Sequence, residues 1–128
     1  MDAPKQRIWG IVRDQDLAGL VSAKWHCDAD AICELGVLIH TRYHGRGVAR
    51  EALGRLMGRW SCFAKNDPYP KVWLARVKPG NHPAKRLFGS LGFEVKGLNW
   101  APATGPFTLM YASRRTQRAS NLQPPGRA

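Results

Sequence analysis

The sequence has no long apolar run and no secretory signal at its start. Its longest uninterrupted apolar stretch is only a few residues, whereas a membrane-spanning helix needs roughly 20. The first residues, MDAPKQR, contain no apolar segment of the kind that a signal peptide carries. We therefore expect a cytoplasmic protein without a membrane partner.

Cysteine is also scarce, with only Cys27, Cys33 and Cys62 in 128 residues. No two of them have the C-x-x-C spacing of a zinc or redox site, and an odd number does not suit a disulfide framework. Histidines are scattered, and a turn separates His40 from His44, so these two do not share a helical face. We expect reduced thiols and no bound metal.

Acidic residues are few, since nine Asp and Glu face 20 Lys and Arg and leave a net charge of +11. Such a charge can serve nucleic-acid binding, but its distribution disfavours that partner. Part of the excess lies in residues 113–128, which have no apolar period and are typical of a disordered tail. Residues 14–34, by contrast, hold five carboxylates against Lys24 alone. We expect one domain over residues 1–112, followed by the basic tail.

Apolar periodicity predicts alternating strands and helices. In the second strand, period-two spacing places Leu17, Gly19, Val21, Ala23 and Trp25 on one face. The strands are expected over 8–13, 17–25, 32–39, 71–77, 93–98 and 107–112, and the helices over 49–60 and 83–91. This order, β-β-β-α-β-α-β-β, combines hairpins with helical crossovers and predicts an α+β (mixed α/β) domain around a central mixed sheet.

The stretch RYHGRGVA, residues 42–49, joins the third strand to the first helix. Unpaired N–H groups at a helix start bind phosphate, and Gly45 and Gly47 remove side chains that would keep an anion away from that backbone. Arg42 and Arg46 add positive charge. The turn is neither a Walker A loop nor a G-x-G-x-x-G loop. Its spacing alone fits a phosphate site and a plain connector equally well.

The longer segment ELGVLIHTRYHGRGVAREAL resembles the signature of the GNAT-type acyl-CoA N-acyltransferase superfamily. In that family a strand ends in a [QR]-x-x-G-x-[GA] turn that cradles the coenzyme A pyrophosphate. A second family element, an asparagine followed by A-x-x-L-[YF]-x-x-x-G-F, is matched by NHPAKRLFGSLGF, residues 81–93. Both elements occur in the family order, and the resemblance covers residues 8–112.

The resemblance implies that acetyl-CoA is the co-substrate and that it binds without a metal. The backbone of the third strand would meet the pantetheine arm, the amides of the glycine turn and Arg46 would hold the pyrophosphate, and Asn81 with its helix would contact the other side. The implied cofactor-binding residues are Val37, Leu38, Ile39, His44, Gly45, Arg46, Gly47, Val48, Ala49, Asn81 and Phe88.

Three departures from the family pattern stand out. His44 occupies a position that usually carries Gln or Arg, so a phosphate contact there would depend on its protonation. Phe88 replaces the tyrosine that protonates the departing thiolate in many members, and it has no proton to give. The resemblance also implies a first strand and two helices for which this chain shows no match, so we expect a short family member.

Glu34 is the candidate catalytic residue. Acyl transfer needs a neutral amine, so a carboxylate within reach, directly or through water, is useful. Glu34 lies ten residues before His44, at a strand position where several family members place their base. The alternative is a solvated carboxylate or a surface ion pair. As a group, the carboxylates of residues 14–34 could also attract a cationic amine.

From these features we expect an N-acetyltransferase that acts on a primary amine of a small molecule or a protein. Two other functions stay open: a degenerate module that binds coenzyme A without turnover, and a basic nucleic-acid-binding protein. Because the strand 8–13 would be an edge of the sheet and its residues 8–12 carry neither charge nor proline, we also expect a homodimer that covers it.

Overall fold

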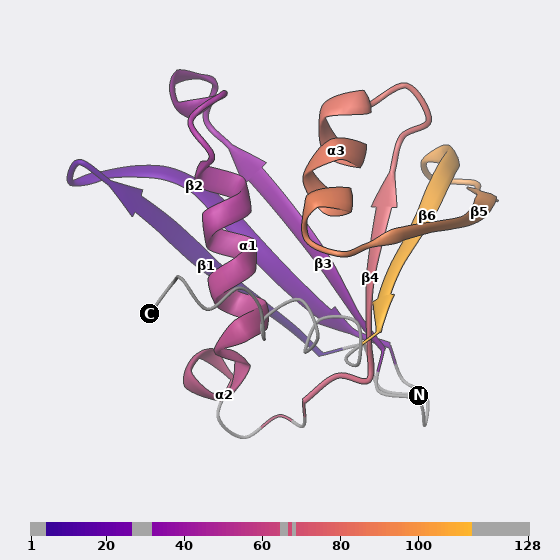
Figure 1. The fold of residues 1–128 in the computed structure, drawn as a ribbon, viewed down its shortest axis with the longest axis horizontal. Helices are drawn as coiled ribbons and strands as arrows, with labels where there is room; N and C mark the ends of the chain where they lie inside the picture. Colours follow the sequence, from indigo (N-terminus) through magenta and orange to yellow (C-terminus); the bar gives the residue numbers. More distant parts are fainter. Residues whose placement is uncertain (1–4, 27–31, 65–66, 68, 114–128) are drawn as a thin grey trace.

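The computed structural model of the protein describes residues 5–26, 32–64, 67 and 69–113. These residues form a six-stranded sheet with the strand order β1-β2-β3-β4-β6-β5, covered by helices (Figure 1). In chain order the elements are β1 (Gln6–Arg13), β2 (Asp16–Trp25), β3 (Ile32–Ile39), the 3-10 turn η1 (Thr41–Tyr43), α1 (Val48–Gly58), α2 (Trp60–Phe63), β4 (Val72–Val77), α3 (His82–Ser90), β5 (Glu94–Ala101) and β6 (Gly105–Ser113).

The predicted fold class and order of elements are confirmed. The sheet is mixed because β3 and β4 run parallel, whereas every other neighbouring pair is antiparallel. The single predicted helix over 49–60 is divided, since α1 ends at Gly58 and Trp60 begins the short α2. The proposed tail lies outside the described residues except for Ser113, which ends β6.

The predicted apolar face of β2 is correct over only part of the strand. Val21 and Ala23 are buried as expected, but Leu17 is 62% exposed and Ala18 is fully buried instead. The pairing with β1 shifts here, because Ile11 faces Gly19 while the next residue of β1 faces Leu17. Ala18 is therefore an extra residue, a β-bulge that reverses the alternation for the residues before it.

The helices pack on one face of the sheet and form the main core with it (Figure 1). Trp60 of α2 is central, because its ring makes edge-to-face contacts with Trp9, Trp25 and Trp73, with centroids 6.2, 5.9 and 5.4 Å apart. Aromatic pairs in this geometry add stability beyond the apolar area they bury. One core thus joins the β1–β2 hairpin to β4.

The opposite face of the sheet is open in the described part of the chain. It presents Ile8, Val12 and Leu38, which are 60%, 66% and 70% exposed. None of the described helices is long and apolar enough to span a membrane. A cytoplasmic location stays a prediction.

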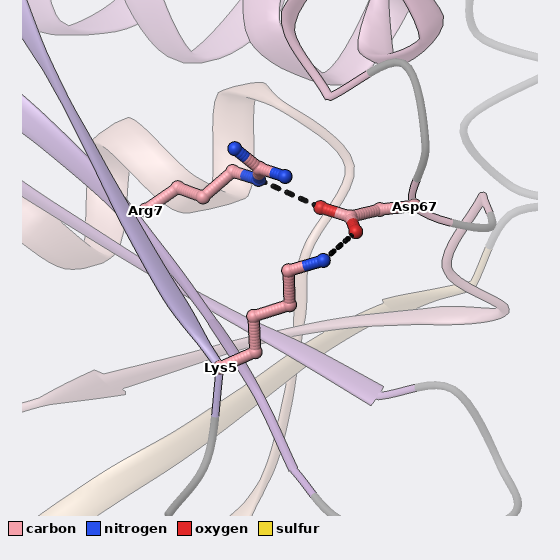
Figure 2. A network of polar contacts seen from close by, with 3 residues as sticks. All are labelled: Lys5, Arg7 and Asp67. Carbon is pink, nitrogen blue, oxygen red and sulfur yellow. Dashed lines mark hydrogen bonds and ion pairs between the residues drawn. The ribbon is translucent and has the colours of Figure 1, made fainter.

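A charge cluster ties the start of β1 to the loop that leads into β4. The Asp67 side chain is only 3% exposed and accepts hydrogen bonds from Lys5 Nζ and from Arg7 Nε, the latter at 2.8 Å (Figure 2). Burial alone would raise the pKa of Asp67, but the hydrogen bonds and charges of Arg7 and Lys5 outweigh burial and lower that pKa. The ion pair therefore stabilises the fold when Asp67 is ionised.

We expect Asp67→Asn to lower the free energy of unfolding by about 1–3 kcal/mol at pH 7, because the Lys5 and Arg7 charges lose their partner. The contribution of Asp67 is fully present above its ordinary pKa of about 3.9 and is lost as the pH falls through the lowered folded-state pKa. Urea unfolding should show the gap between wild type and variant closing in acid. Asp14→Asn, at an exposed turn, is the control. An equal effect of both variants would contradict a role for the cluster.

Candidate functional site

The candidate site begins where β3 and β4 separate. The two parallel strands pair only over Ile32–Val72, Cys33–Trp73 and Glu34–Leu74. Beyond Glu34, β3 continues to Ile39 and β4 to Val77 without pairing with each other. The edge of β3 that turns toward β4 is therefore free of a strand partner from residue 35 onward.

A cleft of about 740 Å³ extends from this opening to the starts of α1 and α3. Most of the residues expected to bind the cofactor line it together: Val37, Leu38, Ile39, His44, Gly45, Gly47, Val48, Ala49 and Asn81. Val37 and Ile39 lie on the helix-covered face of β3, whereas Leu38 lies on the open face. The cleft thus reaches past the edge of β3 from one face of the sheet to the other.

The glycine turn has the geometry expected for an anion site. Gly45 and Gly47 adopt positive φ angles of 77° and 73°, which glycine accepts without strain. Built Cβ atoms at these positions would meet nothing within 4 Å, so the space above the turn is open. The first backbone hydrogen bond of α1 is donated by Glu51 N to Gly47 O. The amides of Val48, Ala49 and Arg50 therefore have no acceptor within the helix.

The His44 side chain braces the turn. Its Nε2 lies 2.8 Å from the carbonyl oxygen of Ile39, and because a carbonyl only accepts, Nε2 carries the proton and donates it. This hydrogen bond ties the turn to the end of β3. His44 lines the cleft, but its donor is directed at the backbone and away from a bound anion.

The Arg46 side chain does not line the cleft. Its guanidinium lies over the Tyr43 ring, 5.6 Å from the centroid, and Arg42 lies 5.7 Å from the same centroid. A small cavity of about 50 Å³ separates Arg46 from Arg13 and Asp14. The charge of Arg46 stays beside the glycine turn, while Arg50, which the sequence interpretation left out, lines the cleft directly.

The second family element is split between the cleft and the core. Asn81 caps α3, since its Oδ1 accepts a hydrogen bond of 3.1 Å from the amide of Ala84. Phe88 is 5% exposed and packs against Phe93 with ring centroids 5.0 Å apart, so it belongs to the core and does not line the cleft. Ala84 and Leu87 line the cleft instead. Both are partly buried against the core and also face the cleft, on the same side of α3 as Asn81.

Glu34 sits at the last paired position, where the strands begin to separate. Its side chain points to the open face and is 20% exposed. His26 Nε2 lies 3.0 Å from Glu34 Oε1, and Arg76 Nε lies 3.4 Å from Oε2. His26 and Arg76 were missed because only the register between strands brings them to Glu34.

Two of the five carboxylates of residues 14–34 lie far from Glu34. Asp14 and Asp16 lie at the β1–β2 turn, beside the far end of β3, where Asp16 is 3.9 Å from Arg42. Asp28 and Asp30 lie outside the described residues. Asp14 and Asp16 therefore do not act together with Glu34 on one amine, because the hairpin carries them away from it.

The structure also bears on metal and thiol chemistry. Within the described ranges, no group of three His, Cys, Asp or Glu side chains could hold a metal ion. Burial raises the pKa of the Cys33 thiol to about 12. Cys33 is thus a neutral core residue at neutral pH and not a nucleophile.

A separate cavity of about 200 Å³ lies between β1 and α1. Of the predicted site residues, only Val48 lines it. The larger cleft is therefore the place where the sequence motifs and the geometry coincide.

Solved structures with a similar fold include the aminoglycoside acetyltransferase AAC(6')-Ib in complex with coenzyme A. Its TM-score is 0.75 at 18% identity, covering 91% of this chain and 70% of that one. A chimera of the spermidine N-acetyltransferase SpeG from Vibrio cholerae and hSSAT has a TM-score of 0.71 at 20% identity, covering 89% of this chain and 72% of that one. At these identities the likeness concerns the fold alone.

Sequence relatives include the N-acetylaspartate synthetases of Rattus norvegicus and Homo sapiens, which are 32% and 31% identical over 116 residues. The match covers 89% of this chain, but the chain spans only 36% of the length of these relatives. The family model of the acetyltransferase (GNAT) domain matches residues 1–94. Because this match covers most of the chain and both signature elements line one cleft, the chain belongs to the GNAT acetyltransferase family.

Proposed function

We propose that this chain binds acetyl-CoA in the cleft beside β3 and transfers the acetyl group to a primary amine at Glu34. The observation that supports this most is the arrangement of the site along β3. One cleft runs from the open glycine turn along residues 37–39 of β3, and Glu34, which does not line the cleft, lies farther along the same strand at its last pair with β4. Acceptors named for the relatives and for the similar structures (aspartate, aminoglycosides and spermidine) all carry amino groups.

The turn end of the cleft suits the pyrophosphate. Backbone amides at the start of α1 and the positive end of its helix dipole face open space above two glycines. Arg50 lines the cleft in the first turn, and Arg42 and Arg46 lie close by over Tyr43. Three cations and several free amides thus meet a polyanionic cofactor.

The middle of the cleft suits the pantetheine arm. Residues 35–39 of β3 pair with β2 on one side only, because β4 has diverged. Their outward N–H and C=O groups are available for hydrogen bonds like those that an added strand would make. Leu87 of α3 provides an apolar wall.

The region beyond the β3 end of the cleft, around Glu34, suits the chemistry. The attacking amine must lose a proton as its nitrogen bonds to the acetyl carbon and the C–S bond breaks. Glu34 can take this proton directly or through a water molecule, and His26 lies within hydrogen-bonding distance to share it. Phe88 is buried and has no proton to give. The thiolate therefore takes a proton from solvent, or it takes the proton that the amine loses.

A coenzyme A-binding module without turnover is the second candidate. It is favoured by the contacts of Glu34 with Arg76 and His26, which occupy both carboxylate oxygens, and by Phe88. Thiol release monitored with DTNB separates the two, because such a module would bind acetyl-CoA and release no thiol with any amine.

The first prediction of this proposal concerns the turn. Acetyl-CoA at a hundredfold excess over Kd should stabilise the fold by about 2.7 kcal/mol. We expect Gly47→Asp to lose most of this stabilisation, because a negative side chain would stand where phosphate approaches. Gly47→Asn is the matched control, since both residues tolerate positive φ and differ mainly in charge. Equal thermal shifts for the Asp and Asn variants would remove the turn from the cofactor site.

The second prediction concerns Glu34. We expect Glu34→Gln to lower kcat by about 10²–10⁴-fold while leaving the acetyl-CoA thermal shift unchanged, because the amide cannot accept the proton. The loss should diminish at high pH, where more of the amine is already neutral. Wild-type kcat in the variant at pH 7 would show that Glu34 is only a surface ion-pair residue.

We also propose that the chain forms a homodimer over β1. Among the described strands β1 is an edge of the sheet with β2 as its one neighbour, and it exposes Ile8 and Val12 on the open face. An apolar edge strand without charge on its exposed face is a template for pairing, and a two-fold partner would cover it.

Ile8→Lys should shift the protein from dimer to monomer in sedimentation velocity at micromolar concentration, because a buried lysine in the interface would lack a partner. Leu98→Lys changes an exposed leucine at the other edge of the sheet and should leave the dimer intact. A wild-type protein that sediments as a monomer would contradict the proposal.

A further inference from the structure

Among the residues that the structure describes, the open face around Glu34 carries more positive than negative charge. Lys24 of β2 is the direct neighbour of Glu34 in the antiparallel pair, so both side chains lie on this face. Arg76 of β4 reaches Glu34 from the other side, and His26 approaches from the end of β2. Glu94, in the same row across the sheet, is 75% exposed and lies 3.8 Å from Lys96.

Arg76 is held in place on this face. Its Nε contacts Glu34 Oε2 at 3.4 Å, and its Cζ lies 5.0 Å from the centroid of the Phe107 ring. In the part of the chain that the structure describes, no second carboxylate pairs with Arg76, and its side chain is 39% exposed. The two terminal nitrogens of a guanidinium held in this way form a fork that matches a carboxylate.

These cations are separate from the anion site at the glycine turn. Glu34 and Ile39 are five residues apart on one strand, which corresponds to about 17 Å. Arg76 and Lys24 therefore lie at the acetyl end of the proposed cofactor path, where the acceptor must bind, and not at the pyrophosphate end.

The charge of this face discriminates between classes of amine. A polycationic acceptor would meet Arg76 and Lys24 with like charge, and the Glu34 carboxylate is already shared with Arg76 and His26. An amine that also carries a carboxylate would present its amino group to Glu34 and its carboxylate to the cations. Like-charge contacts at a binding surface select against wrong partners.

We propose that the acceptor is a carboxylate-bearing amine of the amino-acid class, with its carboxylate paired to Arg76 and Lys24 and its amino group at Glu34. This assignment rests on the proposed acetyltransferase function and gives it a substrate class.

The test compares L-amino acids with their α-amides, and with spermidine and kanamycin, in a DTNB thiol-release assay. Amidation removes the carboxylate charge but lowers the pKa of the amine, so the amide has more neutral amine at a given pH. A faster reaction of the free acid therefore cannot come from amine protonation. We expect kcat/KM for at least one amino acid to exceed that for its amide by about 10–100-fold, the worth of a charge-assisted hydrogen bond.

Substitutions of Lys24 and Arg76 test whether these two cations cause the preference for the free acid over its amide. We expect Lys24→Gln to raise KM for the amino acid about tenfold or more, to change kcat less, and to leave KM for the amide unchanged. Arg76→Gln should do the same and also alter kcat through its contact with Glu34, whereas Arg76→Lys should restore part of the preference. The acetyl-CoA thermal shift of each variant verifies that the fold and the cofactor site are intact.

The possible results separate the two levels of the proposal. If spermidine or kanamycin reacts faster than every amino acid, or if acid and amide react equally, the carboxylate subsite is overturned while the acetyltransferase stands. If acetyl-CoA binds and no amine in the panel releases thiol, the acetyltransferase function fails, and the substrate class fails with it.

Discussion

The separation of β3 from β4 is the feature on which the site depends. Pairing stops at Glu34 and Leu74, so a strand edge that would otherwise be satisfied is left for a ligand. Each of these strands leads into a helix whose N-terminus lines the same cleft, at Gly47 for α1 and Asn81 for α3. An open backbone edge and two positive helix ends therefore face one space, which suits a long and polyanionic molecule.

Charge is arranged in two places along β3. At the turn, arginines and free amides surround open space above the glycines. At the other end, Glu34 is set among Lys24, His26 and Arg76 on the open face of the sheet. The first place suits phosphate, and the second suits a molecule that needs both a proton acceptor and a counter-ion. The described helices all lie on one face of the sheet, so the phosphate site at the turn and the charged group around Glu34 on the open face are separate.

Local chemistry explains what the sequence predicts well. The glycine turn was recognisable because positive φ and a helix start depend on adjacent residues, and apolar periods gave the order of the elements. The features that the sequence does not predict depend on the register between strands far apart in the chain. The bulge at Ala18 reverses the exposure of Leu17, and only the pairing of β2, β3 and β4 brings Lys24, Glu34 and Arg76 together. Phe88 matched a family position, yet its direction into the core depends on packing against Phe93.

A crystal structure of the protein with acetyl-CoA would test the central claim most directly. It should show the pyrophosphate on the amides of residues 45–49, the pantetheine arm along residues 37–39, and the acetyl group within reach of Glu34 directly or through one water. Acetyl-CoA bound in the cavity between β1 and α1, or bound in the cleft with its acetyl group directed away from Glu34, would contradict it.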